Sequence, residues 1–265
     1  MKKSIQIIAT AFAILLGNVG FSQVDSVYIV KGDSVLAVYA TTDVDSVIFY
    51  NPNPIDTTTN STITDADGNV YTSVTIGTQE WMTENLRTTK YSDGTTIPNV
   101  TDADEWYEVG EWYEAGAWCH YDNDNQYDTI YGKLYNWHAV ETEKLCPTGW
   151  HVPTDAEWTV LTDYLAANGH SGAEGKALKS TSGWNDYNGQ SLNGTDNYGW
   201  LGLPGGQRVF DGSFDLIGLS GWWWSSSKYH TNSGWDRGLH YYFYDFVWRD
   251  TDSKETGLSI RCLRD

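Results

Sequence analysis

The chain has 265 residues, 35 acidic against 16 basic side chains and a formal net charge of −19. This charge disfavours nucleic acid and anionic membrane surfaces as partners, since both repel an acidic protein. Aromatic residues make up 15%, including 14 tryptophans and 18 tyrosines, which predicts either a core built from rings or a surface that stacks on sugars. For any single tryptophan we favour the core.

The first 22 residues have the pattern of a secretory signal peptide. Lys2 and Lys3 form a basic start, Ile5 to Gly17 is apolar, and Gly20 and Ser22 are the small residues before a cleavage that leaves Gln23 first. The apolar run is shorter than the ~20 residues that span a bilayer. We therefore expect a secreted or cell-surface protein with no membrane insertion of the mature chain.

Residues 23–50 predict a small β unit. Three β-rich stretches, at 26–31, 34–40 and 45–50, are separated by short polar turns, and the first two form a hairpin. Residues 51–62 contain Pro, Asn and Thr with almost no apolar residues, which is typical of an extended linker. The main domain is expected at residues 63–265.

The main domain opens with strands expected at 70–76 and 79–82, joined by a turn at Gly77-Thr78. Next, EWYEVG (105–110) and EWYEAG (111–116) form an acidic and aromatic local duplication. Asp122, Asp124 and Asp128 then crowd carboxylate oxygens, the ligands that Ca²⁺ prefers. The spacing is not that of an EF-hand, so a solvated loop is the alternative that we favour over a Ca²⁺ site.

The clearest helix in the sequence starts at Thr154. Thr154 and Glu157 form a capping box, in which each side chain accepts a hydrogen bond from the other's backbone N–H. Trp158, Leu161, Tyr164 and Leu165 then recur at helical spacing, and Asn168-Gly169 is typical of a helix end. We expect this to be the main helix, packed on antiparallel strands.

The remainder predicts a short helix at 172–179, a long polar loop at 186–199, and strands at 207–210, 214–219, around 222–224, at 240–247 and at 257–263. Trp222 and Trp224 would share one face of a strand and Trp223 the other. At least one of them should then be less buried, unless helices cover both faces.

Three cysteines in a secreted chain suggest one disulfide and one free thiol. We expect Cys146, before the helix, to pair with Cys262, in the last strand; the bridge would contribute about 4–5 kcal/mol. Cys119 is then a buried free thiol. A nucleophilic Cys119 with His120 is disfavoured, because neighbours in a strand point to opposite faces.

Six stretches resemble the Fibrobacter succinogenes major paralogous (FISUMP) domain: NLRTTKYSDGTTIPNV, YGKLYNW, LCPTGWHVPTDAEW, LPGGQR, WWSS and GLSIRCLRD. The likeness covers residues 63–265. It implies a secreted bacterial protein, and the biochemical role of the family is undefined.

A weaker resemblance is to the formylglycine-generating-enzyme and C-type-lectin-like superfamily, in WHVPTDAEW and GLSIRC. It implies a loop-rich α+β fold in which the first and last strands pair, and it supports the Cys146–Cys262 bridge. The enzyme's chemistry is not implied, because that activity uses two closely spaced cysteines and Cys262 has no such neighbour.

The sequence does not predict an enzyme. It contains neither a G-x-S-x-G nucleophile elbow nor an H-E-x-x-H zinc motif, and nothing selects a pair of carboxylates. We expect a non-catalytic binding or adhesion module whose partner is an extracellular glycan or a surface protein, with no cofactor unless Ca²⁺ is bound. A structural scaffold that binds proteins is the alternative, and an enzyme is the least favoured. The candidate ligand-binding residues are Asn188, Tyr198, Trp223, Trp235, Asp236 and Arg237.

Overall fold

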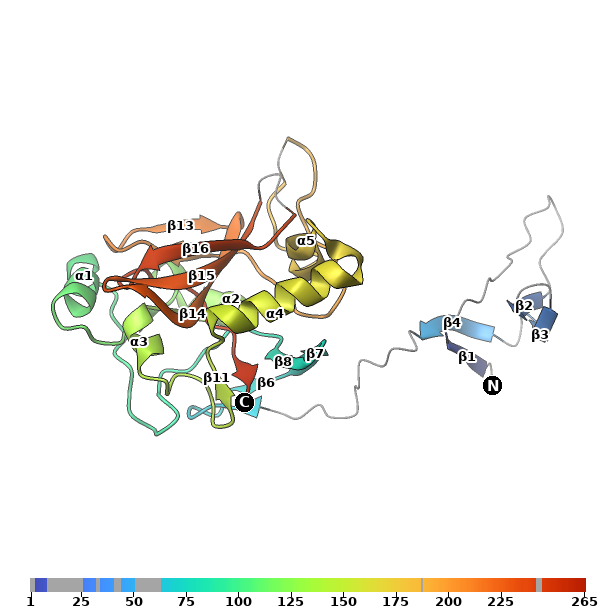
Figure 1. Cartoon of the computed structure of the whole chain (residues 1–265), viewed down its shortest axis with the longest axis horizontal. Helices are drawn as coiled ribbons and strands as arrows, with labels where there is room; N and C mark the ends of the chain where they lie inside the picture. The colour runs from blue at the N-terminus through green and yellow to red at the C-terminus, as the bar shows by residue number, and fades with distance from the viewer. Residues whose placement is uncertain are drawn as a thin grey trace. The chain divides into compact units, whose positions relative to one another are not determined.

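The structure, a computed structural model, describes residues 3–8, 26–31, 34–40, 44–50 and 63–265 apart from 187 and 242–244 (Figure 1). The chain divides into two units, Met1–Asp56 and Thr57–Asp265. In the first, β2 (Ser26–Lys31) and β3 (Ser34–Ala40) form an antiparallel hairpin, and β1 (Lys3–Ile8) runs parallel to β4 (Val44–Tyr50). The expected linker 51–62, and the predicted signal peptide apart from 3–8, lie outside the described residues.

The second unit is a mixed α+β domain. Its helices are α1 (Ala103–Glu111), α2 (Asp128–Tyr131), α3 (Trp137–Glu141), α4 (Asp155–Leu165) and α5 (Glu174–Leu178). Its strands are β5 (Ile63–Thr64), β6 (Val70–Tyr71), β7 (Ser73–Ile76), β8 (Gln79–Met82), β9 (Trp118–Cys119), β10 (Leu134–Tyr135), β11 (Trp150–His151), β12 (Gly205–Arg208), β13 (Phe214–Ile217), β14 (Ser220–His230), β15 (Ser233–His240), β16 (Trp248–Ser253) and β17 (Leu263–Arg264).

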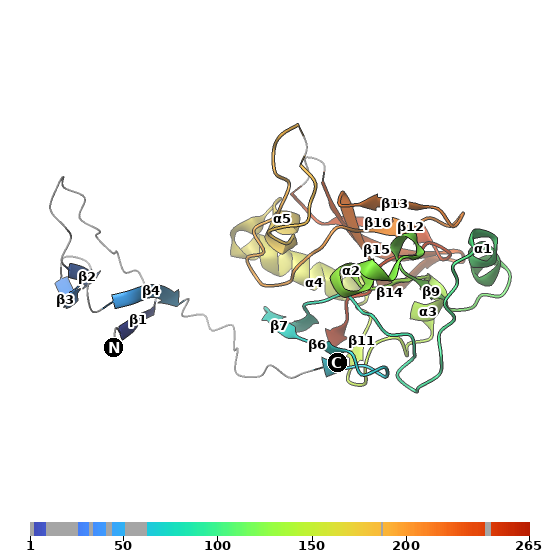
Figure 2. The same ribbon diagram turned by 180° about the vertical axis from the view of Figure 1, so that it is seen from behind.

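Two sheets organise this unit, and their pairing is mostly antiparallel. One has the strand order β11-β17-β8-β7, so that the last strand of the chain pairs with an early one. The other has the order β13-β12-β14-β15-β16 and curls into a half-barrel (Figures 1 and 2). Its one parallel contact joins β12 to β14 at Gly206 and Gly221.

The capping box predicted at the start of α4 is present. The Thr154 hydroxyl accepts from the Glu157 N–H at 3.2 Å, and Glu157 accepts from the Thr154 N–H at 2.7 Å. The helix ends at Leu165, and a wider turn follows to His170, in which Gly169 has a φ of 93°. Trp158 and Leu161 on its apolar face are buried in one cluster with Trp81 and Trp223.

All three tryptophans of the 222–224 run are buried, because both faces of β14 are covered. Trp223 packs in the cluster beneath α4, whereas Trp222 and Trp224 pack with Tyr135 and Trp137 on the other face. Because both faces of the strand are covered, none of the three tryptophans shows the exposure that was expected for at least one of them.

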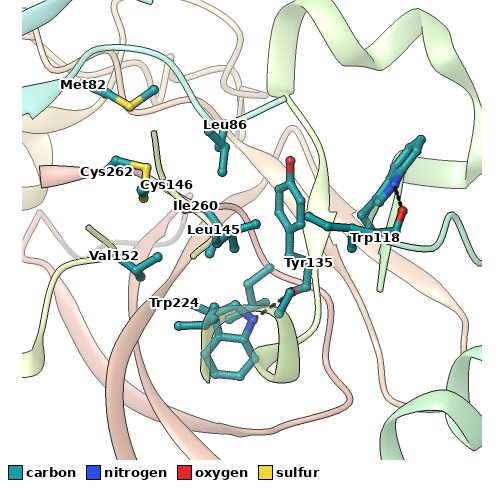
Figure 3. Packing of buried hydrophobic residues seen from close by; sticks show 14 of the residues in the cluster. Met82, Leu86, Trp118, Tyr135, Leu145, Cys146, Val152, Trp224, Ile260 and Cys262 are labelled. Atoms are coloured by element: carbon teal, nitrogen blue, oxygen red, sulfur yellow. Dashed lines mark hydrogen bonds between the residues drawn. A yellow bond between two sulfur atoms is a disulfide. The ribbon is translucent and has the colours of Figure 1, made fainter. Parts of the chain in front are cut away.

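The predicted disulfide joins Cys146 to Cys262, with their Cα atoms 6.0 Å apart. Figure 3 shows it among core side chains that include Met82 and Val152. The bridge ties the segment before β11 to the residue that directly precedes β17, the last strand of the same sheet.

A buried hydrogen-bond network connects three of the sequence motifs. Asn85 Oδ1 accepts from Arg261 Nη2 at 2.7 Å and from Trp223 Nε1 at 2.8 Å. The Arg261 guanidinium is completely buried 4.3 Å over the Trp200 ring, and burial lowers its pKa to about 9. Asn85, Trp223 and Arg261, one from each of the motifs NLR, WWS and IRC, thus hold the domain together from inside, and all three are buried.

Several local predictions differ from the structure. The strand expected at 257–263 is a regular strand only at β17, and β16 lies where no strand is predicted. Residues 103–111, for which only a duplication was noted, form α1, which begins where Asp102 caps the Glu105 N–H at 3.0 Å. The strand predicted at 240–247 is wrong at 241 and 245–247, the described residues that follow His240. Strand β15 ends at His240, and the Asp245 carbonyl accepts from the Lys176 N–H of α5 at 2.8 Å instead of extending a sheet.

Candidate functional site

A pocket of about 590 Å³ opens beside the disulfide. It lies between the segment from α3 to Cys146, strand β11 with the residues leading to α4, and the far part of β14. The lining residues are Trp137, Val140, Glu141, Glu143, Leu145, Cys146, Trp150, His151, Val152, Thr154, Ser226, Lys228 and Asp265.

The base of the pocket is apolar and fixed. Val140, Leu145 and Val152 are buried core residues. The Trp137 indole donates its N–H to the Ser225 carbonyl at 2.9 Å, which locks the ring between α3 and β14. Trp150 is half-buried and packs against the same core, so it is the indole of this pocket that retains solvent access.

His151 and Asp265 form one edge of the pocket, and Glu157 supports His151 from outside the lining. His151 Nδ1 lies 2.8 Å from Asp265 Oδ1, and His151 Nε2 lies 3.1 Å from Glu157 Oε1. Burial alone would raise the pKa of Glu157, but hydrogen bonds from Thr154 and His151 outweigh burial and lower it. Both ring nitrogens of His151 contact carboxylate oxygens, so the imidazole is held in place and shapes this edge.

The other charged side chains of the rim differ in whether they form an ion pair. Glu141 is paired with Lys254 at 3.1 Å. Glu143 and Lys228 are exposed, and neither forms an ion pair with a described residue. An apolar base with an indole, free carboxylate and ammonium groups, and hydroxyls is suited to binding a small polar molecule with apolar faces.

Three of the residues predicted to bind ligand lie inside the molecule. Trp223 is 1% exposed, Asp236 0% and Arg237 2%. Trp223 supports the Asn85 network, and Arg237 donates to Asp155 Oδ1 at 2.7 Å. These residues cannot form an open binding surface, because α4 and the neighbouring strands cover them.

The other three predicted residues reach the surface but are not assembled. Trp235 is half-buried, with the Arg249 guanidinium 3.5 Å over its ring and Tyr229 at 4.6 Å. Asn188 is exposed in its loop, and Tyr198 packs on Tyr164 and His170. The contacts of Trp235 and of Tyr198 share no residue.

The proposed Ca²⁺ ligands do not converge. Asp128 pairs with Lys133 Nζ at 2.6 Å, and Asp124 accepts from the Gln126 N–H at 3.0 Å. In the part of the chain that the structure describes, no group of three or more His, Cys, Asp or Glu side chains could hold a metal ion. Asp122, Asp124 and Asp128 are therefore not a metal site, because local donors already occupy two of the three.

Cys119 is the buried free thiol that was expected. Burial raises the pKa of its thiol to about 12, although Arg208 acts in the opposite direction. A thiol in this state is not nucleophilic near neutral pH.

Sequence reasoning missed the pocket, since its walls come from four separate stretches of chain. Trp150 and His151 belong to the motif LCPTGWHVPTDAEW, which predicts the start of the helix but not a pocket. The sequence feature that could have indicated the pocket is the tryptophan and histidine pair shortly before the capped helix.

The second unit is thus a disulfide-closed, tryptophan-rich α+β domain with a pocket at the start of its main helix. Its family follows from a comparison with protein-family models, in which the Fibrobacter succinogenes major domain (Fib_succ_major) matches residues 74–264. The chain belongs to this family, which confirms the resemblance seen in the motifs. Neither the curated proteins nor the solved structures that were compared contain a match. Within the described residues, no helix has the length and apolar character needed to cross a membrane.

Proposed function

We propose that this protein is a secreted or cell-surface, non-catalytic binding module, and that its ligand is a carbohydrate held in the pocket beside the disulfide. The observation that carries the proposal is the half-buried Trp150 in a pocket of about 590 Å³ whose rim includes unpaired Glu143 and Lys228. Ligand pockets typically measure about 300–1,000 Å³. The volume therefore suits one or two sugar rings.

The chemistry of the pocket supports this ligand class. The C–H faces of a sugar ring are apolar and pack on an indole, while its hydroxyls need hydrogen-bond partners. Glu143 can accept from such hydroxyls and Lys228 can donate to them, and the Thr154 and Ser226 side chains lie in the same lining.

We further propose that the domain is a variant of the C-type-lectin-like fold. Three features support this: the pairing of β8 with the final strand β17, the disulfide to that strand, and the long helix α4 that contacts the β14–β15 pair. The disulfide also supports a location outside the cytoplasm, because such bonds persist in oxidising compartments.

The test is thermal unfolding of the full chain across a panel of plant and bacterial polysaccharides. A ligand that binds the folded state alone adds about 2.7 kcal/mol at a hundredfold excess over its Kd. For a polysaccharide that raises the midpoint, we expect Trp150→Ala and Glu143→Gln each to weaken binding about tenfold. Trp235→Ala is the matched control and should bind as the wild type does.

Loss of binding in Trp235→Ala with retention in Trp150→Ala would move the site to the β15 surface and refute the pocket. A panel that produces no shift would refute carbohydrate binding and favour the alternative, a surface scaffold that binds proteins. We do not propose formylglycine chemistry, because Cys119 is buried and Cys146 and Cys262 are joined to each other.

A further inference from the structure

Helix α1 and the turn after it present three aromatic rings to solvent. Tyr107 is 37% exposed, Trp112 64% and Tyr113 68%, whereas large apolar side chains are usually covered. The Tyr107 and Trp112 rings meet edge to face, with centroids 6.3 Å apart. We call these rings, with Glu108, Glu111 and Glu114, the α1 face; the helix lies at the opposite end of the domain from α5 (Figures 1 and 2).

The exposure of these rings follows from how α1 is anchored. Trp106 is 1% exposed and donates its indole N–H to the Glu255 carbonyl at 2.7 Å. Gly110 lies so close to Glu255 that a Cβ there would be 2.6 Å from its Cγ. Arg208 donates to the Asp102 carbonyl at 3.0 Å, next to the helix start. With these residues holding the inner side, Tyr107, Trp112 and Tyr113 cannot turn inward.

The charged side chains of the segment that carries the rings all have one sign. Residues 101–117 contain no Lys, Arg or His. Among the described residues, none pairs with Glu108, Glu111 or Glu114 in an ion pair. The α1 face is therefore an aromatic platform inside a field of unneutralised carboxylates.

We propose that the α1 face docks an arginine- and lysine-rich segment of a partner protein. Guanidinium groups stack on exposed indole and phenol rings and also pair with carboxylates, so one side chain satisfies both features of the face. An apolar partner would bury carboxylates without compensation, and an anionic one would be repelled. This inference is independent of the proposed carbohydrate site, which lies on other residues.

The test is calorimetric titration of the full chain with the synthetic peptide RSRSRSRS at physiological salt, with ESESESES as the charge-reversed probe. We expect the basic peptide to bind and the acidic peptide to be inert. Trp112→Ala/Tyr113→Ala should weaken binding about tenfold, and Glu108→Gln/Glu111→Gln/Glu114→Gln at least as much. Both variants should unfold near the wild-type midpoint, because the changed side chains lie largely at the surface.

The matched control removes three carboxylates elsewhere, with Asp163→Asn/Asp186→Asn/Asp215→Asn, and should bind within about twofold of the wild type. Equal weakening by both charge variants would show attraction to the net charge alone and overturn the proposal. Undiminished binding by the aromatic variant, or no binding of RSRSRSRS to the wild type, would overturn it as well. The polysaccharide assay with Trp150→Ala is unaffected by any of these outcomes.

Discussion

At the scale of single residues, Asp236 lies in an unfavourable environment for a charged carboxylate. It is completely buried, and neither of its carboxylate oxygens has a hydrogen-bond partner. It lies opposite Asp250 in the β15–β16 pair, and Asp252 is two residues further along β16, on the same face. Burial raises the pKa of Asp236 well above its ordinary value, and Asp252 and Asp250 add to the effect. Burial likewise raises the pKa of Asp252 to about 6.

These raised pKa values determine in which direction the stability of the domain changes with pH. A raised folded-state pKa means that the folded chain binds more protons than the unfolded chain. The stability contribution of such a group is complete below its unfolded pKa of about 4 and is lost as pH rises through the folded pKa. The domain should therefore lose stability from these two groups between about pH 4 and pH 6, and the loss from Asp236 should extend higher.

The substitution Asp236→Asn tests this expectation, because it removes the charge while keeping the shape. We expect its unfolding midpoint to exceed that of the wild type at pH 7, and the difference to shrink as the pH falls to 4. Chemical unfolding at several pH values measures it, with the exposed Asp163→Asn as control. A difference between variant and wild type that does not change with pH would contradict the assigned protonation.

At the scale of elements, one carboxylate holds helix α4 to the five-stranded sheet. Asp155 accepts from Arg237 Nη2 at 2.7 Å, and from Arg249 Nε and Nη2 at 2.9 Å each. The bonds from Arg249, together with those from Arg237, lower the pKa of Asp155 in spite of its burial. The helix start is thus tied to β15 and β16 by charge as well as to the core by Trp158.

We expect Asp155→Asn to destabilise the domain by about 2 kcal/mol, since it leaves the buried Arg237 without its anionic partner. A lowered pKa means that the stabilisation is present above the unfolded pKa and is lost as pH falls. The loss should therefore be larger at pH 7 than at pH 3. Urea unfolding at both pH values is the measurement.

The control for Asp155 is Arg249→Met, because Arg249 is largely exposed and its removal keeps the Asp155–Arg237 pair. Its cost should be clearly smaller, as is usual for exposed ion pairs. An equal loss of unfolding free energy in the two variants would mean that the buried Asp155–Arg237 pair stabilises the domain no more than the exposed pair does.

At the scale of the whole domain, the disulfide closes a loop with a sequence separation of 116. In the chain-entropy account, a bridge of this span contributes about 4–5 kcal/mol by restricting the unfolded state. We expect Cys146→Ser/Cys262→Ser to lose about that much in guanidinium unfolding. Reducing agent should lower the wild-type midpoint and leave that of the double variant unchanged. The same response to reductant in both proteins would point to Cys119 or another cause.

Local patterns were sufficient to predict several elements from the sequence. The capping box of Thr154 and Glu157 and the turn at Gly77 involve residues a few positions apart, so the start of α4 and the turn of the β7–β8 hairpin could be predicted directly. The strand predicted at 240–247 failed at its described C-terminal part, 245–247, where the Asp245 carbonyl bonds to α5, which is distant in sequence, and not to a sheet.

The sequence by itself predicted the family, the main helix and the Cys146–Cys262 pair, because these depend on short motifs and two of the motifs contain these cysteines. Only the tertiary structure decided which aromatic residues a ligand could reach. Trp223 is covered by α4, Trp150 lines a pocket, and Trp112 stands in solvent. The physical reason is that burial depends on which elements cover a residue, and those elements come from remote parts of the chain.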